Sequence, residues 1–311
     1  MSLEPVYGPH PSRCLGVSLG VDPVSFSTSC YMACAMCSVL NPVRSLLKYS
    51  PGELVKRVER DLEERELKID TIYVYGSSDP FLYDELTELV KDLRGVSEQH
   101  GSRLVVRTLG YFQRALEAVV ALVDQLHIPF YIADMDWNTL YRPSINVTRS
   151  EYLEKLRELF NTTRETAEKL ILEVVVARQG AESVFTDYLD DYLILIKRLK
   201  ARKVLLKTID RPVRQSNLKP VSRQTLERLK EMLEDEGSWV QTCLKPGAPP
   251  RVRARRAFIE VYNHVLRKPL KANEVNEIYG EIGIVAAETL VSRRLVSKQI
   301  WENQLFYLPS K

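Results

Sequence analysis

Short runs rich in β-branched and aromatic residues alternate with amphipathic helical stretches along most of this 311-residue chain. The strand-like runs cover residues 15–24, 70–76, 102–110, 126–133, 171–177 and 203–209. The helical stretches, with apolar residues at helical spacing, cover residues 52–68, 81–96, 112–125, 149–170, 185–201 and 222–237. About six such β/α units predict a parallel sheet with its helices outside. In such folds the chemistry takes place at the carboxyl ends of the strands.

The alternation stops after residue 237, and a different composition follows. Residues 245–256 combine proline, glycine and several arginines, which is typical of a basic linker. Residues 257–311 predict three short helices and a hairpin, the order of a winged-helix-like domain. In that domain we expect Asn273 to cap a helix that begins near Glu274. The predicted organisation is a β/α domain at 1–244, a basic linker at 245–256 and a winged-helix-like domain at 257–311.

Charge and hydropathy favour a cytoplasmic location. The net charge of +3 gives no general affinity for nucleic acid, so any basic site has to be local. The first residues lack the charged and apolar regions of a secretory signal. The most apolar stretch, residues 115–133, is interrupted by Glu117, Asp124, His127 and Pro129, so we expect no membrane span.

Three of the five cysteines lie within eight residues: Cys30, Cys34 and Cys37, in the spacing C-x3-C-x2-C. An odd count with this crowding argues for metal ligands rather than for a disulfide framework. Three thiolates in one loop suit soft metals or an iron–sulfur cluster. A structural zinc site would need a fourth ligand, for which Cys14 or His10 is available. Buried cysteines acting as small apolar residues are the remaining alternative.

The cysteine loop resembles the signature of the radical S-adenosylmethionine (SAM) enzymes. The resemblance implies that Cys30, Cys34 and Cys37 bind a [4Fe-4S] cluster and that SAM occupies its open iron. An electron from the cluster then cleaves the sulfonium bond, and the 5′-deoxyadenosyl radical abstracts a hydrogen atom. An incomplete parallel (β/α)6 barrel and a flavodoxin- or ferredoxin-like electron donor are implied as well. Where the family usually has an aromatic residue, this chain has Met36, which we expect to pack against the adenine or the cluster.

The turn YGSSDP, residues 75–80, resembles the Gly-Gly-Glu-Pro-like turn that holds the amino group of SAM in this superfamily. Ser78 stands where glycine is common, and Asp79 stands for glutamate. The resemblance implies that Gly76, Ser77, Ser78, Asp79 and Pro80 bind the cofactor, with a carboxylate accepting from the ammonium group. The alternative is a turn into a helix with Ser78 or Asp79 as N-cap.

Further candidates fall at or just past strand ends. We expect ribose and carboxylate contacts from Thr108, Asp134 and Arg178. Arg142 and Arg211, each in an Arg-Pro pair, suit a substrate anion such as phosphate, and solvated loop arginines are the alternative. We expect the basic run of the linker to follow the phosphate backbone of a nucleic acid, with a solvated linker or the start of a helix as the alternative. The run consists of Arg251, Arg253, Arg255 and Arg256.

A closer resemblance covers most of the chain. Residues 7–23, 141–144 and 208–229 are similar to radical SAM proteins grouped with the archaeal wyosine-type tRNA-modification enzymes. Cys14, His10 and Leu109 depart from that pattern. The resemblance implies RNA as the substrate class, with tRNA as the first candidate. The alternative function is a nucleic-acid-binding regulator whose cluster senses redox state and whose SAM site is degenerate.

Overall fold

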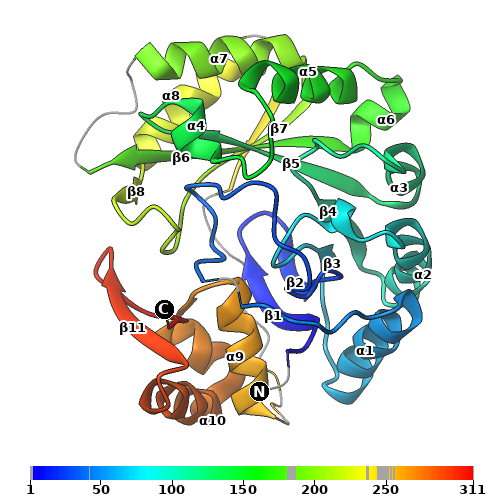
Figure 1. The fold of residues 1–311 in the computed structure, drawn as a ribbon, viewed down its shortest axis with the longest axis vertical. Helices are drawn as coiled ribbons and strands as arrows, with labels where there is room; N and C mark the ends of the chain where they lie inside the picture. The colour runs from blue at the N-terminus through cyan, green and yellow to red at the C-terminus, as the bar shows by residue number, and fades with distance from the viewer. Residues whose placement is uncertain are drawn as a thin grey trace. The chain divides into compact units, whose positions relative to one another are not determined.

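Parallel strands joined by helices form an incomplete (β/α) barrel in the computed structural model, as the alternation predicted (Figure 1). The structure describes residues 3–41, 43–180, 187–235, 238–243, 252, 254 and 256–310. The strands of this part are β1 (Val6–Ser12), β2 (Gly16–Val21), β3 (Thr71–Val74), β4 (Arg103–Arg107), β5 (Gln125–Ile132), β6 (Leu170–Gln179), β7 (Lys203–Thr208), β8 (Leu218–Pro220) and β9 (Trp239–Thr242). Its helices are α1 (Pro51–Glu64), η1 (Pro80–Leu82), α2 (Leu86–Gln99), α3 (Leu116–Leu122), α4 (Trp137–Tyr141), α5 (Arg149–Phe160), α6 (Arg164–Lys169), α7 (Asp187–Leu199) and α8 (Arg223–Glu234).

The chain divides into two compact units. Unit 1 comprises Met1–Ser29, Ser38–Val105 and Pro246–Lys311, and unit 2 comprises Cys30–Cys37 and Val106–Lys245. The cysteine loop therefore belongs to unit 2, whereas the turn at residues 76–80 belongs to unit 1. The predicted domain boundaries stay a prediction, because most of the linker lies outside the described residues.

In unit 2, β5, β6, β7 and β9 pair in parallel, and β8 pairs antiparallel with β6. The first eight residues of β6 are buried, because its run of leucine and valine is covered on both faces. Helices α5 and α7 contact each other and lie along one face of these strands (Figure 1). The opposite face is therefore the place where polar side chains of the strands can gather.

In unit 1, β2 pairs in parallel with β3, and β1 pairs antiparallel with β2. The sequence did not predict β1, because Pro9 and Pro11 donate no backbone hydrogen bonds and argue against a strand. They are accommodated because β1 is an edge strand. Helix α1 begins at a capping box: the Glu53 carboxylate accepts from the backbone N–H of Ser50 at 2.8 Å, and the Ser50 hydroxyl accepts from that of Glu53 at 3.4 Å.

The C-terminal part of unit 1 runs in the order helix, strand, helix and hairpin, and its assignment as a winged-helix-like domain stays a prediction. Gly280 has a positive φ (φ +68°, ψ −163°), a backbone conformation that favours glycine. It divides α10 into two helical segments joined by a kink. Helices α9 and α10 lie side by side, and the small sheet has the order β10-β12-β11 (Figure 1). The elements are α9 (Ala257–Arg267), β10 (Leu270–Lys271), α10 (Ala272–Ser292), β11 (Val296–Trp301) and β12 (Gln304–Pro309).

Two local predictions were wrong. Asn273 does not cap α10: the helix begins at Ala272, and the Glu274 carboxylate accepts from the N–H of Lys271 at 3.0 Å. The single helix predicted at 149–170 is two helices, α5 and α6, because the Thr163 side chain caps the second one. Among the described residues, none of the helices combines the length and the apolar character needed to cross a membrane.

Candidate functional site

The cysteine loop, residues 30–37, is held by the backbone of the segment at the end of α4. The N–H of Ala33 donates to the Arg142 carbonyl at 2.9 Å, and the N–H of Ala35 donates to the Leu140 carbonyl at 2.8 Å. These contacts give the Tyr-Arg-Pro-Ser motif at 141–144 a structural role. It forms one side of a frame around the loop.

A second segment, which follows β7, forms the other side of the frame. The N–H groups of Arg214 and Gln215 donate to the carbonyls of Cys37 and Ala35, each at 2.9 Å. The Arg142 guanidinium donates to the side-chain carbonyl of Gln215 and so ties the two sides together. The predicted contact of Arg142 with a substrate anion stays a prediction, since its guanidinium already has a partner within unit 2.

None of the three cysteines of the loop forms a disulfide, and their thiols interact electrostatically. Cys34 is buried, whereas Cys30 and Cys37 are partly exposed. Burial raises the pKa of Cys34 well above its usual value, and the neighbouring thiols of Cys37 and Cys30 raise it further. The guanidinium groups of Arg107 and Arg214 act in the opposite direction on that pKa. Thiolates this close repel one another, so a cationic centre that binds them would be stabilising.

The other residues proposed for this region are also placed. Met36 is buried in the cysteine loop. Cys14 and Cys243 are disulfide-bonded, contrary to the expectation that the cysteines form no disulfide. Cys14 is therefore not a free fourth ligand for the zinc site considered from the sequence.

A buried carboxylate in unit 2 pairs with two cationic side chains from other strands of the sheet. Glu173 of β6 accepts from the Arg107 guanidinium at 2.6 Å and from the ammonium group of Lys207 on β7. Arg107 also donates to the hydroxyl of Tyr131 at 3.2 Å. Burial raises the pKa of Glu173, but the charges of Arg107 and Lys207 outweigh burial and hold the pKa well below its usual range. Glu173 therefore stays ionised inside the fold.

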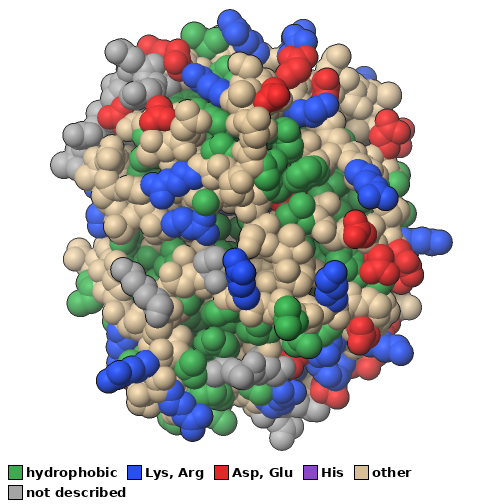
Figure 2. All heavy atoms as spheres, in the orientation of Figure 1, with side chains coloured by type: hydrophobic (Ala, Val, Ile, Leu, Met, Phe, Trp, Pro, Cys, Tyr) green, Lys and Arg blue, Asp and Glu red, His purple; other side chains and the backbone are tan. Residues whose placement is uncertain are grey.

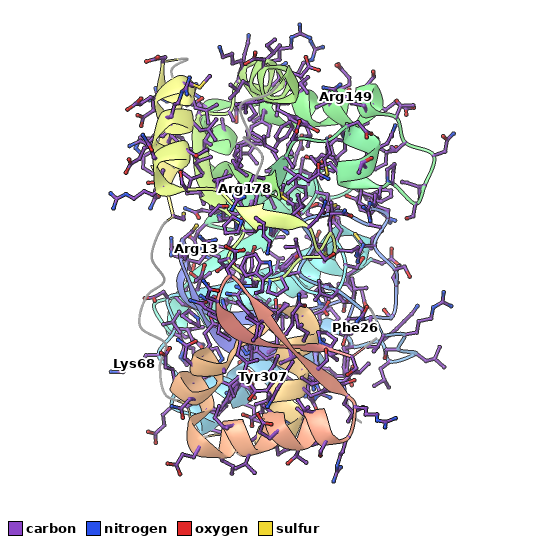
Figure 3. The ribbon with its side chains drawn as sticks, turned by 90° about the vertical axis from the view of Figure 1, so that its left-hand side faces the viewer. Arg13, Phe26, Lys68, Arg149, Arg178 and Tyr307 are labelled. Carbon is purple, nitrogen blue, oxygen red and sulfur yellow. The ribbon has the colours of Figure 1, made fainter. Side chains whose placement is uncertain are left out.

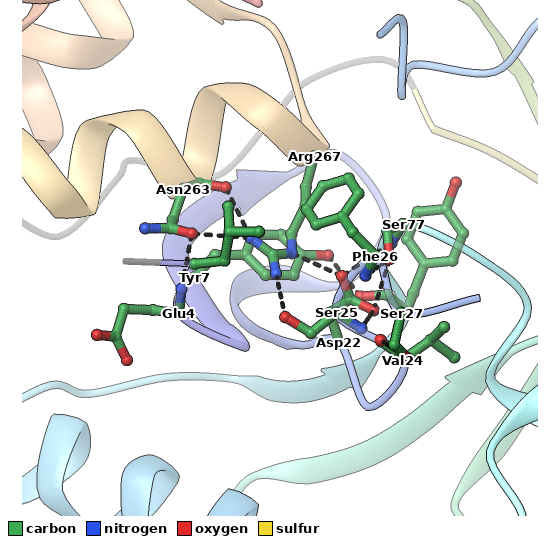
Figure 4. Close-up of polar contacts among 12 residues, drawn as sticks. Glu4, Tyr7, Asp22, Val24, Ser25, Phe26, Ser27, Ser77, Asn263 and Arg267 are labelled. Atoms are coloured by element: carbon green, nitrogen blue, oxygen red, sulfur yellow. Dashed lines mark hydrogen bonds and ion pairs between the residues drawn. The ribbon is translucent and has the colours of Figure 1, made fainter. Parts of the chain in front are cut away.

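The turn after β3 is built around Asp22, which directly follows β2. The Asp22 carboxylate accepts from the backbone N–H of Ser77 at 3.0 Å, from the Ser77 hydroxyl at 3.1 Å and from the N–H of Ser25 at 2.9 Å. It also accepts from Nε of Arg267 at 2.8 Å (Figure 4). A Cβ on Gly76 would lie 2.2 Å from Cγ of Asp22, so only glycine fits this approach.

Arg267 reaches this network from the last turn of α9. The side chains of Arg267 and Asp22 are 0% and 1% exposed. A second guanidinium nitrogen donates to the carbonyl of Asn263 at 3.1 Å, and the group lies 5.2 Å from the ring centre of Tyr7 and 4.9 Å from that of Phe26. The ion pair is thus enclosed by residues of its own unit (Figure 4).

Ser78 is the one member of the turn with an unsatisfied polar group. Its side chain is buried, and its Oγ has no hydrogen-bond partner within the described part of the chain. The Asp79 carboxylate accepts from the N–H of Phe81 at 3.0 Å and so caps η1, as the N-cap alternative proposed. Leaving a buried hydroxyl unpaired costs about 1–3 kcal/mol. Ser78 is therefore the group that a bound polar ligand would satisfy.

The weaker cofactor candidates lie at or past strand ends, as expected. Thr108 is buried, and its hydroxyl accepts from the N–H of Gly110 at 3.0 Å. Arg178 lies where β6 meets β8, and its Nε donates to the carbonyl of Pro220 at 3.1 Å (Figure 3). Asp134 is half-buried just after β5. Their contacts with a cofactor stay predictions.

The structure also describes two of the remaining substrate candidates. Arg211 is buried and pairs with Asp210 at 3.0 Å, so it is not a solvated loop residue. Arg256 is exposed and lies 3.6 Å from the Glu4 carboxylate. The other arginines of the basic run lie outside the described residues: Arg251, Arg253 and Arg255.

Sequence reasoning missed the charged groups that support the two candidate elements. Glu173 had a signal, because it is the one acid in the strand-like run ILEVVVA. Asp22 had a weaker one, as a carboxylate directly after a strand. Arg267 had none, since nothing distinguishes it among the 44 lysines and arginines of the chain.

No protein-family model matches the chain. It is similar to the UPF0026 protein of Helicobacter pylori strain J99, with 24% identity over 301 residues, 95% of this chain and 94% of that protein. It is also similar to GTPase Obg of Brachyspira hyodysenteriae, with 26% identity over 234 residues, but this match spans only 33% of that protein and 74% of this chain. Among solved structures, a radical SAM methyltransferase from Sphaerobacter thermophilus matches with a TM-score of 0.51 and 17% identity, over 73% of this chain and 66% of that one. This likeness shows a shared fold.

The donor groups fit a cluster and a polar cofactor. In the described part of the chain, no three His, Cys, Asp or Glu side chains converge as ligands of one metal ion. The thiolates of an iron–sulfur cluster bind separate irons, so three cysteines outside any disulfide on one framed loop suit it without such convergence. The unpaired Ser78 hydroxyl beside Gly76 suits a ligand with polar groups.

We expect Glu173→Gln to destabilise the protein most at neutral pH. The variant leaves Arg107 and Lys207 without their carboxylate, and losing one partner of a buried pair costs about 3–5 kcal/mol. The pKa of Glu173 is lowered from 4.5 by folding, so its contribution is complete above about pH 5 and is lost as the pH falls through the folded pKa. The difference between wild-type and variant urea midpoints should therefore narrow below about pH 4.

Glu168→Gln is the matched control. Glu168 is exposed and pairs with Lys203 at 2.9 Å, so its loss should change the stability of the protein little at either pH. A Glu173→Gln effect as small as this, or one that does not change between pH 7 and pH 4, would contradict the assigned role of the buried carboxylate.

Proposed function

We propose that this chain is a radical SAM enzyme in which Cys30, Cys34 and Cys37 hold a [4Fe-4S] cluster and Gly76–Pro80 receives SAM. The observation that carries the proposal is the cysteine loop, with three cysteines outside any disulfide, in the spacing C-x3-C-x2-C, inside a backbone frame. The fold shared with a radical SAM methyltransferase supports it. The unpaired Ser78 hydroxyl supports the cofactor role of the turn.

Each residue then has a defined task. When bound, the cluster supplies the electron that cleaves SAM reductively. Arg107 and Arg214 offset the negative charge of the Cys34 thiolate, which burial alone would disfavour. Gly76 leaves room for the Asp22 side chain, which holds the turn in place. Ser78 provides an unpaired hydroxyl for the cofactor. The electron itself comes from a separate protein, for which we propose a flavodoxin- or ferredoxin-like donor.

A Cys30/Cys34/Cys37 triple alanine variant should fold but lose its iron and sulfide, because the frame around the loop is made by backbone groups. Wild-type protein reconstituted without oxygen should contain about four irons per chain and form 5′-deoxyadenosine from SAM under dithionite. A Cys14/Cys243 double alanine variant is the control and should keep its iron. Zinc in place of iron, or a reduced, iron-loaded wild type that forms no 5′-deoxyadenosine, would contradict the proposal. A loaded cluster without SAM binding points instead to the redox-sensing regulator.

Ser78→Ala should separate cofactor binding from folding. The Ser78 hydroxyl has no partner in the described part of the chain, so its removal should leave the melting temperature unchanged or raise it. The variant should bind SAM about two- to tenfold more weakly, as measured by equilibrium dialysis. In the control Ser97→Ala, the lost hydroxyl donates to the Arg94 carbonyl at 2.8 Å, so stability should fall while SAM affinity is kept. The opposite pattern would remove Ser78 from the cofactor site.

For the substrate we propose RNA, with tRNA as the first candidate. Support comes from the resemblance of residues 7–23, 141–144 and 208–229 to the wyosine-type group, and from the basic run at 251–256. On the face in Figure 2, Lys and Arg side chains are scattered, and several lie beside Asp or Glu. The second half of α10 is less suited to RNA, because four of its exposed residues are acidic or apolar: Glu281, Ile282, Val285 and Glu288.

Replacing Arg251, Arg253, Arg255 and Arg256 by alanine should weaken tRNA binding in a filter assay. The slope of log affinity against log salt should fall by about one for each arginine that contacts phosphate. The control is Arg223→Ala on α8, where the arginine already pairs with Glu227 at 2.7 Å. If the fourfold variant binds tRNA with unchanged affinity and salt slope, RNA recognition by this run is wrong.

A further inference from the structure

We propose that Arg267 is a positioning residue for the turn Gly76–Pro80, so that helix α9 of the C-terminal part controls how well the turn binds SAM. Arg267 acts through Asp22, which holds the Ser77 backbone. This inference rests on the cofactor role proposed above for the turn. It goes further in assigning the C-terminal part a function at that site.

The path from Arg267 to the turn consists of two contacts. Nε of Arg267 donates to Oδ2 of Asp22 at 2.8 Å, and the same oxygen accepts from the N–H of Ser77 at 3.0 Å. The Ser77 hydroxyl donates to the other oxygen at 3.1 Å and accepts from the N–H of Phe26 at 2.8 Å (Figure 4). Ser77 is thus held by both its backbone and its side chain, next to the unpaired hydroxyl of Ser78.

Arg267 is itself held in one place. Its Nη2 donates to the Ser25 hydroxyl at 3.3 Å and its Nη1 to the Asn263 carbonyl at 3.1 Å, while Tyr7 and Phe26 lie against the guanidinium. Its side chain is 0% exposed, so it has no access to a ligand and can act only through its neighbours. A planar group with this many fixed donors cannot be replaced by an ammonium group without losing contacts.

Removing Arg267 would leave the Asp22 carboxylate, 1% exposed, without its cation. A buried anion in that state becomes protonated or draws in water, and either change alters what it can accept from Ser77. Asp22 packs directly against Gly76, because a Cβ on Gly76 would lie 2.2 Å from Cγ of Asp22. If Asp22 moves, the turn therefore has to move with it.

The test compares wild type with Arg267→Met and Arg267→Lys by two measurements. Amide hydrogen exchange of the ligand-free protein reports on the Ser77 N–H. Equilibrium dialysis of the iron-loaded protein reports on SAM affinity. We expect Arg267→Met to accelerate exchange of that amide at least tenfold and to weaken SAM binding by about tenfold to a hundredfold, with iron content unchanged. Arg267→Lys, the milder change if Arg267→Met does not fold, should move both quantities in the same direction by less.

Two controls separate positioning from general stability. Arg57→Met removes a guanidinium that also has a carboxylate partner, Glu4 at 2.6 Å, and a ring, Tyr49 at 4.9 Å, but that pairs with neither Asp22 nor the turn among the described residues. Gly280→Ala destabilises unit 1 through the kink of α10. Both should keep wild-type exchange at Ser77 and wild-type SAM affinity. If the Arg267 variants behave as these controls do, positioning by Arg267 is overturned. If instead the proposed function is wrong, the wild type itself will bind no SAM. Amide exchange at Ser77 would then still decide whether Arg267 fixes the turn.

Discussion

The ion pair between Asp22 and Arg267 is buried from water and constrains the rest of unit 1. Charges this deep are tolerable only when each has its partner and its hydrogen bonds. The carboxylate accepts from Ser25, Ser77 and Arg267, so it joins the end of β2, the turn after β3 and the end of α9. Three stretches far apart in the sequence thereby become one structure, and the C-terminal helices are part of it.

The two candidate elements are stabilised in different ways but follow the same rule. In unit 2 the cysteine loop is fixed by main-chain hydrogen bonds, and none of its thiols is used in a disulfide. In unit 1 the turn is fixed by a buried carboxylate, which leaves the Ser78 hydroxyl free. In each case the groups that fix the element are not the groups proposed to bind. The unpaired Ser78 hydroxyl is costly to the fold, and such a cost is expected where function needs it.

What the sequence could predict was local. The β/α order follows from hydrophobic periodicity, and the cysteine site follows from three residues within one loop. Strand β1 escaped because its prolines argue against a strand until an edge position is known, and the break between α5 and α6 depended on a cap at Thr163. The Asp22–Arg267 pair spans 245 positions, and no periodicity or spacing connects such residues. Arg107, Glu173 and Lys207 likewise meet only because of the strand order in the sheet, in which β7 lies beside β6 and β4 lies one strand further on the other side.

The sequence separation of that ion pair also sets an order of events during synthesis. A ribosome adds about 5–20 residues per second, so roughly 12–50 seconds pass between the appearance of Asp22 and that of its cation, 245 positions later. In that interval the cysteine loop and both sides of its frame have already been made, since the frame ends at Gln215. The ribosome has thus synthesised every residue of the cysteine loop and its frame before it synthesises Arg267. Helix α9 is the last element that the hydrogen-bond network of the turn requires.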